Sequence, residues 1–262
     1  MSVDAAGVDV TAHAGPGPRP AVYSRVLLKF SGEALLGGAP SGFDMDTVRL
    51  IAQQVRRVVA RGVELAIVVG GGNIVRGLDL SRRDGIDRVT GDYMGMLATV
   101  INALALRDAI QGLGMQCRVQ SAIAMQQVCE PFIPLRAVRH LEKGRVVILA
   151  GGHGSPFFTT DTTAALRAAE IGAQVLLKAT KVDGIYTADP LIDPSARRLA
   201  HLSYLEVLNR GLTVMDNTAL TLCMDNHMPI VVFDLLAEGS LEKVILGEPV
   251  GTRVDAEAEA EA

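Results

Sequence analysis

The stretch ELAIVVGGGN, residues 64–73, joins an apolar run of strand type to three consecutive glycines. The run is continuous rather than alternating, as in strands that are covered on both faces. Glycines directly after such a strand allow positive φ angles and a close approach of the backbone to a ligand. They also cost chain entropy, which favours a ligand-binding reason over a merely flexible connection. The spacing fits neither a P-loop nor a GxGxxG fingerprint.

Further short apolar runs alternate with helical patterns on both sides of this stretch. The expected strands are Arg25–Phe30, Glu64–Val69, Gln116–Val119, Arg145–Leu149, Gln174–Leu177 and Pro229–Phe233. The expected helices are Asp46–Arg61, Asp92–Gly112, Pro134–Lys143, Thr160–Ile171, Tyr204–Arg210 and Asn217–Asn226. This alternation predicts an α/β fold with a mostly parallel sheet and right-handed crossovers. In such sheets ligands bind at the carboxyl ends of the strands, where the glycine clusters of this chain lie.

Composition supports one large domain. The chain has 262 residues, of which 49% are hydrophobic, so it can bury a substantial core. We expect a single domain over residues 22–252, between disordered tails at 1–21 and 253–262, of which the second is an acidic Glu-Ala repeat.

Charge and cysteine usage exclude several classes of protein. The formal net charge of −4 and the absence of Trp argue against general nucleic-acid binding. Cys117, Cys129 and Cys223 lack metal-ligand spacing and are predicted to be buried free thiols of a reducing compartment. Neither a signal peptide nor an apolar run of membrane-spanning length is visible, so a cytoplasmic location and no membrane partner are expected.

Polar residues that can meet phosphate follow the predicted strands. Lys29 and the turn Ser31-Gly32 can offer an ammonium and backbone N–H groups. As a strand-end lysine, Lys29 is expected to be exposed and to contribute little stability. Lys178 extends the buried run Val175–Leu177, so it calls for an anionic partner.

A third glycine cluster, GGHGSPFFTTD at residues 151–161, ends in hydroxyls and a carboxylate at the start of a predicted helix. Thr160 and Asp161 can cap that helix, and Asp161 can alternatively orient lysines or a metal from there. Residues of this cluster can therefore serve structure, chemistry or both.

Seven ordered segments together carry a family resemblance that covers roughly residues 23–252. They are LLKFSGEAL (27–35), GGGN (70–73) followed by Arg76, GDYMGMLATV (91–100), PFFTTD (156–161), KATKVDG (178–184), TADP (187–190) and VMD (214–216). The set resembles the amino acid kinase superfamily and, within it, the bacterial uridylate kinases. The resemblance implies a three-layer αβα sandwich and ATP-dependent phosphorylation of UMP to UDP in pyrimidine biosynthesis. It also implies a homohexamer that GTP activates and UTP inhibits.

The same resemblance implies roles for individual residues. The groups expected to drive the transfer are Lys29, Lys178, Asp161 and Asp216. The residues expected to bind ATP are Lys29, Phe30, Ser31, Gly32, Gly72, Arg76, Thr180, Tyr186 and Asp189. Those expected to bind UMP are Gly71, Asp92, His153, Gly154, Ser155, Pro156, Phe157, Phe158, Thr159 and Thr160. Mg²⁺ is expected to be held mainly by nucleotide phosphates, with no dedicated protein cage. Because a phosphate acceptor already carries an ionised oxygen, His153 is not needed as a general base.

One departure and two alternatives remain. The family loop commonly reads Thr-Gly-Asn-Pro where this chain has His153-Gly154-Ser155-Pro156, which changes the contacts of its first and third positions. A sister kinase that phosphorylates a small acid is one alternative, opposed by Asp92 and the loop 157–160. A nucleotide sensor without activity is the other, opposed by the retained lysines and aspartates.

Overall fold

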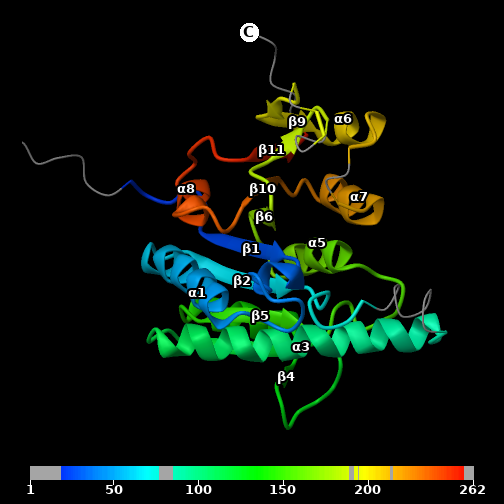
Figure 1. Ribbon diagram of the computed structural model, residues 1–262. Coiled ribbons are helices and arrows are strands. Elements are labelled where there is room, and N and C mark those ends of the chain that lie inside the picture. The colour runs from blue at the N-terminus through cyan, green and yellow to red at the C-terminus, as the bar shows by residue number, and fades with distance from the viewer. Residues whose placement is uncertain (1–18, 77–84, 189–191, 194, 213–214, 257–262) are drawn as a thin grey trace, which may run out of the picture.

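A computed structural model of the chain describes residues 19–76, 85–188, 192–193, 195–212 and 215–256. Its centre is a nine-stranded sheet of order β4-β3-β5-β2-β1-β6-β10-β11-β9 (Figure 1). These strands are β1 Arg25–Phe30, β2 Glu64–Val69, β3 Cys117–Ser121, β4 Glu130–Pro131, β5 Val146–Ala150, β6 Val175–Thr180, β9 His201–Ser203, β10 Ile230–Asp234 and β11 Thr252–Asp255. Every neighbouring pair in this sheet is parallel except β10 with β11. The mostly parallel sheet predicted from the sequence is therefore confirmed.

Helices cover both faces of the sheet. One face carries α1 Met45–Ala60, α3 Arg88–Gly112 and α8 Ser240–Ile245. The short 3-10 helix η1 Gly32–Leu35, between β1 and α1, belongs to the same face. The other face carries α4 Pro134–Glu142, α5 Thr160–Glu170, α6 Tyr204–Asn209 and α7 Asn217–Asp225. A small second sheet pairs β7 Ile185–Tyr186 with β8 Arg198–Leu199. The predicted three-layer αβα sandwich is confirmed.

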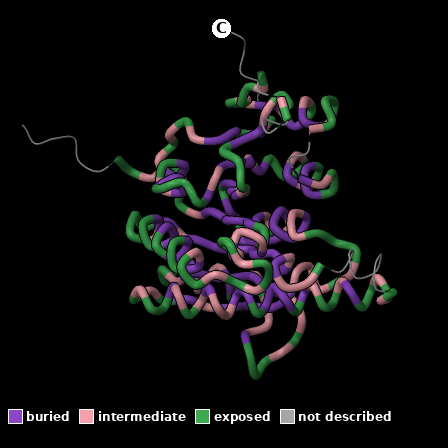
Figure 2. Tube along the Cα trace, viewed as in Figure 1, coloured by how far each residue is buried: buried purple, intermediate pink, exposed green. Residues whose placement is uncertain are grey.

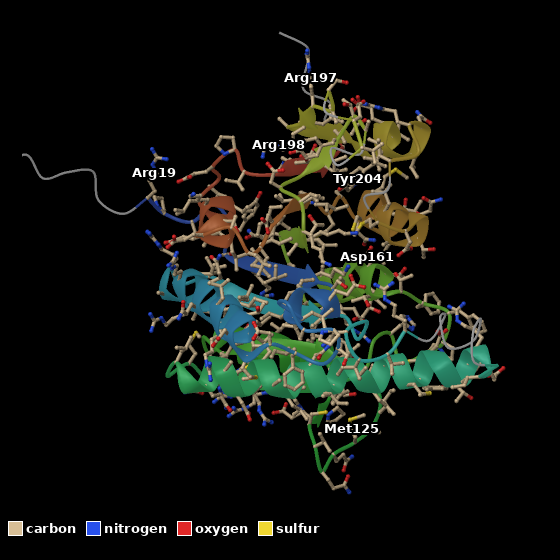
Figure 3. All side chains as sticks on the ribbon, in the orientation of Figure 1. Arg19, Met125, Asp161, Arg197, Arg198 and Tyr204 are labelled. Carbon is tan, nitrogen blue, oxygen red and sulfur yellow. The ribbon has the colours of Figure 1, made fainter. Side chains whose placement is uncertain are left out.

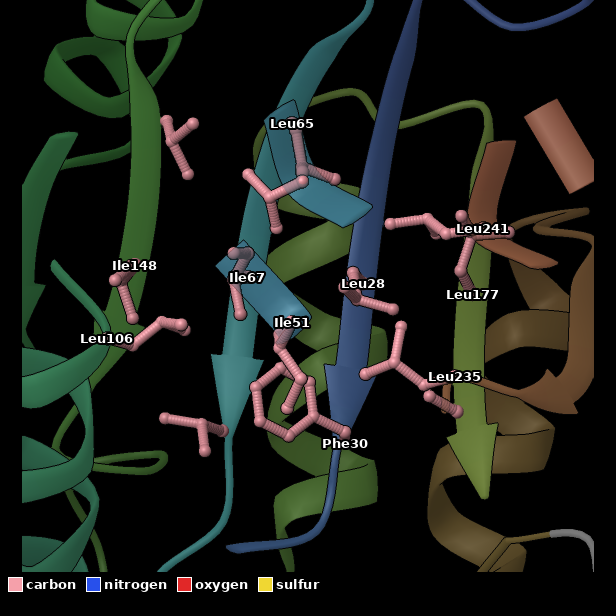
Figure 4. Packing of buried hydrophobic residues seen from close by; sticks show 14 of the residues in the cluster. Leu28, Phe30, Ile51, Leu65, Ile67, Leu106, Ile148, Leu177, Leu235 and Leu241 are labelled. Carbon is pink, nitrogen blue, oxygen red and sulfur yellow. The ribbon is translucent and has the colours of Figure 1, made fainter. Parts of the chain in front are cut away.

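The central strand β1 supplies both hydrophobic cores. Val26, Leu28 and Phe30 belong to the core beneath α1 and α3, where Figure 4 shows Phe30 close to Ile51. Leu27 belongs to the core beneath α5. Alternation along a strand then points Lys29 to the α5 side. Buried residues concentrate in these central strands, whereas exposed ones gather on the outer helices (Figure 2).

Three sequence predictions need correction. Strand β6 continues to Thr180, so Lys178 lies inside the strand rather than after it. Lys29 lies within the strand predicted for it but is only 8% exposed, not exposed as expected. Strand β11 reaches Asp255, so the first residues of the predicted acidic tail are ordered. Of the two predicted tails, residues 1–18 and 257–262 lie outside the described part of the chain. Arg19 to Ala21 and Ala256 lie within it.

The short strands were not predicted because they form by pairing with distant strands and have no hydrophobic periodicity of their own. β4, β7, β8, β9, β11 and the short helix α8 were not predicted. His201 on β9 and Arg253 show the reason for β11: both side chains bond to Asp255, at 2.7 and 2.5 Å. The His201–Asp255 contact joins residues 54 positions apart, so no local periodicity indicates it.

The cysteines are buried free thiols, as predicted. Burial raises the pKa of Cys117 and of Cys223 to about 12, so neither is a thiolate at neutral pH. Among the helices of the described ranges, α3 alone is long and apolar enough, by length and composition, to cross a membrane. Its inner face packs on α1, β3 and β5.

Candidate active site

The register of two neighbouring strands brings two lysines together. Parallel pairing of β1 with β6 places Lys29 opposite Lys178. Leu27 and Leu176, two residues earlier on the same face, lie in the core beneath α5. Both ammonium groups therefore emerge at the carboxyl ends of adjacent strands, toward the N-terminus of α5.

Asp161 lies between the two lysines. Its Oδ1 is 2.5 Å from Lys29 Nζ and its Oδ2 is 2.8 Å from Lys178 Nζ. Asp161 lies in the first turn of α5 and is labelled in Figure 3. Thr159, rather than Thr160 or Asp161, caps the helix, accepting from the N–H groups of Asp161 and Thr162. The cap leaves the Asp161 carboxylate available for the lysines.

Burial and charge shift the pKa values of this triad. Burial by itself would raise the pKa of Asp161, but Lys29 and Lys178 outweigh it and the pKa lies below its usual value. Burial lowers the pKa of Lys178, and neighbouring Lys29 lowers it further, against the attraction of Asp161. Two ammonium groups beside one carboxylate leave a local excess of positive charge, which suits an anionic ligand.

The glycine turns pack too closely for side chains. A Cβ on Gly32 would lie 2.6 Å from the Gly70 carbonyl oxygen, and one on Gly71 would lie 2.6 Å from that of Gly95. The turn after β1 and the turn after β2 are thus in direct backbone contact. Glycine at these positions leaves the backbone N–H groups accessible beside Lys29.

A cavity of about 460 Å³ opens at these turns. It unites predicted residues from the four glycine-rich and helical segments, namely Lys29, Ser31, Gly71, Gly72, Arg76, Asp92, Phe158, Thr159 and Thr160. It also includes residues to which no role was assigned, namely Gly70, Val75, Arg88, Gly95, Met96, Thr99, Gly152 and Thr163. A signal for some of them existed: Arg88, Asp92, Met96 and Thr99 recur at helical spacing along one face of α3.

Asp92 ties α3 to the acceptor loop, which we define as residues 151–160. Its carboxylate pairs with Arg88 Nε, 2.9 Å from both oxygens, and accepts from the N–H of Phe157 at 2.8 Å. Phe157 has a positive φ of 72° and an exposed ring with the Arg88 guanidinium over it. Asp92 therefore fixes the position of Phe157, three residues before α5 begins.

His153 lies behind the cavity wall. Its ring stacks on Phe158, with centroids 4.3 Å apart, and its carbonyl accepts from Arg167. Phe158 lines the cavity, whereas the predicted acceptor residues His153, Gly154, Ser155, Pro156 and Phe157 do not. The side chain of His153 thus supports the loop rather than facing the cavity.

A second cavity of about 350 Å³ lies on the other side of the turn after β1. Thr180 lines it, with Lys181, Leu235, Leu236 and the segments 33–34 and 36–39. Tyr186 lies outside this lining and donates to Asp183 at 2.6 Å. Asp189, also predicted for this side, lies outside the described residues.

Three other predicted residues have defined surroundings. Arg76 pairs with Glu33 at the edge between the cavities. Phe30 is a core residue whose carbonyl accepts from Gly70, so only its main chain faces the turns. Asp216 caps α7 and accepts from the hydroxyls of Thr159 and Thr162, so its carboxylate supports the start of α5.

A three-layer sandwich with paired lysines and close glycine turns at the carboxyl ends of its central strands defines a class of protein suited to bind phosphate. The sequence agrees, because residues 24–234 match the model of the amino acid kinase family, and the chain belongs to that family.

Two solved structures are especially similar. The UMP kinase from Bacillus anthracis is 41% identical, with a TM-score of 0.88 over 92% of this chain and 98% of that one. The UMP kinase from Ureaplasma parvum is 35% identical, with a TM-score of 0.83 over 88% and 98% of the two chains.

Proposed function

We propose that this chain is a UMP kinase that transfers the γ-phosphate of ATP to UMP, giving UDP for pyrimidine nucleotide synthesis. The observation that carries the proposal is the Lys29–Asp161–Lys178 triad between two cavities. Lys29 lines the larger cavity, and Thr180, two residues beyond Lys178, lines the smaller. Similarity to two UMP kinases over about nine tenths of the chain gives the acceptor.

The arrangement suits transfer between two anions. Catalysis of phosphoryl transfer rests on in-line positioning and on electrostatic stabilisation of the equatorial oxygens. Lys29 and Lys178 supply positive charge where the strands end, and Gly32 and Gly72 supply backbone donors. Because the Asp161 carboxylate holds both lysines, the two charges keep fixed positions while the phosphoryl group moves.

We place the UMP in the larger cavity and ATP in the smaller, with their phosphates meeting at the triad. Phe158 offers an apolar wall, Thr159 and Thr160 offer hydroxyls, and Asp92 offers a carboxylate suited to ribose hydroxyls. A small acid acceptor has no base that would pack on such an apolar wall. These contacts favour a nucleotide acceptor over that of a sister kinase.

Mg²⁺ fits this site as an ion carried by the nucleotide. Asp161 is engaged by two lysines, and Asp216 by a helix cap and two hydroxyls. Phosphate oxygens and water therefore remain its natural ligands. When bound, Mg²⁺ would neutralise phosphate charge.

We further propose a cytoplasmic homohexamer that GTP activates and UTP inhibits, on the strength of the family resemblance. The outer face of α3 supports an assembly, because Tyr93, Met94, Leu97 and Ile101 expose large apolar side chains along it. Exposed apolar stripes of this kind mark protein interfaces.

The decisive experiment is a coupled ADP-release assay with ATP and Mg²⁺, comparing UMP, CMP, dUMP and acetylglutamate, with and without GTP or UTP. Turnover confined to UMP supports the proposal. Activity on acetylglutamate alone would move the chain to a sister kinase. Folded protein that binds ATP but uses none of the acceptors would point to a nucleotide sensor.

A further inference from the structure

The inner face of α3 carries two buried polar side chains one helical turn apart. Thr99 is 5% exposed and Asn102 is fully buried. Their neighbours on the same face, such as Ala103 and Leu106, are apolar core residues. Buried polar groups cost stability unless they are hydrogen-bonded, so their partners indicate what they do.

Asn102 holds the glycine turn after β2. Its amide nitrogen donates to the Gly70 carbonyl at 2.7 Å and to Asn73 Oδ1 at 2.7 Å. Asn73 returns a hydrogen bond to Asn102 Oδ1 at 2.9 Å and also donates to the Gly42 carbonyl at 2.7 Å. All four N–H groups of this reciprocal amide pair are used, which makes the network specific in geometry.

Thr99 holds the acceptor loop. Its hydroxyl donates to the Met96 carbonyl at 2.7 Å and accepts from the N–H of Gly151 at 2.8 Å. Gly151 is the first residue after β5 and has a positive φ of 76°. Thr99 therefore fixes the point at which the acceptor loop leaves the sheet.

We propose that Thr99 and Asn102 are positioning residues, which hold the acceptor loop and the phosphate-binding glycine turn to one rigid helix. Errors of about 1 Å in such an arrangement reduce transfer rates strongly. Through α3, the pair thus sets the position of the acceptor loop relative to the glycine turn. This inference rests on the proposed function for its kinetic consequences but on hydrogen bonds alone for its geometry.

The first test compares Thr99→Val with Thr99→Ser. Valine keeps the shape but removes the hydroxyl, whereas serine keeps the hydroxyl. We expect Thr99→Val to raise the KM for UMP about fivefold, the scale of one lost hydrogen bond, with the KM for ATP changed by less than about twofold. Thr99→Ser should restore the wild-type KM.

The second test compares Asn102→Leu with Tyr204→Phe. Tyr204 also donates to a buried main-chain carbonyl, that of Met228 at 2.6 Å, but far along the chain from either turn. Both changes remove buried hydrogen bonds and should lower the Tm. Only Asn102→Leu should lower kcat, by about tenfold or more, because only it frees the glycine turn. Wild-type kcat in folded Asn102→Leu, or equal kcat losses in the two variants, would overturn the proposal.

Amide hydrogen exchange of peptides spanning residues 149–155 separates this inference from the proposed function. Faster exchange in Thr99→Val but not in Thr99→Ser supports the positioning role, even if the wild-type protein fails to phosphorylate UMP. Unchanged exchange together with an unchanged KM overturns it, even in an active UMP kinase. If Asn102→Leu does not fold, the Thr99 pair decides the matter.

Discussion

The charge of Lys178 does not stabilise the fold by itself. Burial and the neighbouring ammonium of Lys29 lower its pKa, so the charged form is held against a cost. A base with a lowered pKa in the folded state weakens stability at pH values below that pKa. At neutral pH the charge of Lys178 therefore lowers the stability of the fold, and an anionic ligand beside it would offset that cost.

We expect Lys178→Met to separate activity from stability. The kcat should fall by about 100-fold or more because a phosphate-neutralising charge is lost. The free energy of unfolding, measured in urea without nucleotide, should stay equal or rise, since Lys29 still pairs with Asp161. The control Lys143→Met, at an exposed helix end, should change neither quantity. A loss of more than about 2 kcal/mol in Lys178→Met would contradict this account.

Asp161 should show the opposite behaviour. Its pKa is lowered in the folded state, so its stabilisation is complete above the ordinary value of 3.8 and is lost as the pH falls below it. Asp161→Asn should cost about 3 kcal/mol at pH 7, because two buried ammonium groups lose their partner. The difference from wild type, followed by urea unfolding against pH, should shrink as the pH falls below about 4. A constant difference down to pH 2 would be inconsistent with the ion-paired triad.

At the scale of elements, the start of α5 depends on the start of α7. Asp216 accepts from the backbone of Ala219 at 3.0 Å and from the Thr159 hydroxyl at 2.5 Å, and Thr159 in turn caps α5. The two helices pack on each other. Through Thr159, this chain of caps fixes where Asp161 enters the site.

Asp216→Asn tests whether that support is the whole role of Asp216. Asparagine caps helices about as well as aspartate, so the free energy of unfolding should change by less than about 1 kcal/mol. If the carboxylate acts through α5, kcat should fall by less than about tenfold. A fall of about 1000-fold in a stable variant would instead give Asp216 a direct role at the phosphates.

Asp92, near the start of α3, has its effect on the acceptor side. Asp92→Asn weakens the pair with Arg88 and removes a charge suited to ribose hydroxyls. We expect the KM for UMP to rise about tenfold, the scale of one lost charged contact, and the KM for ATP to change by less than twofold. Steady-state titration of each nucleotide at saturating partner checks this, and equal effects on both would argue against the ribose contact.

At the scale of the whole molecule, α3 faces two ways. Its inner face holds the glycine turns through Thr99 and Asn102, and its outer face exposes Leu97 at 48% and Ile101 at 47%. Any partner that covers the outer face would sit one helix away from the phosphate site. The proposed assembly and the proposed chemistry therefore share one element.

Leu97→Glu should disrupt the assembly. Burying a carboxylate in an apolar interface is costly, so light scattering should show the mass of wild-type protein shift toward the 27.7 kDa of one chain. Leu205→Glu, on α6 of the opposite face, serves as the matched control and should leave the mass unchanged. A variant at Leu97 with wild-type mass would exclude the outer face of α3 as an interface.

Much of the site followed from local pattern. Apolar runs located the six main strands to within a few residues, and the glycines and Lys29 at their ends indicated a phosphate site. The strong signals were those that a few neighbouring residues carry by themselves. Resemblance supplied the acceptor, and the predicted role of Asp189 stays a prediction because that residue lies outside the described ranges.

What the sequence alone determined is the six main strands, the parallel sheet and the residue types suited to bind phosphate, because periodicity and turn chemistry are local properties. Tertiary structure decided which residues act together. Strand register set Lys29 opposite Lys178, helix capping placed Asp161 between them, and side chains on α3 reached the carbonyl of Gly70 and the N–H of Gly151. The register and the α3 contacts join residues tens of positions apart, and backbone groups carry no sequence signal of the distant partners they will meet.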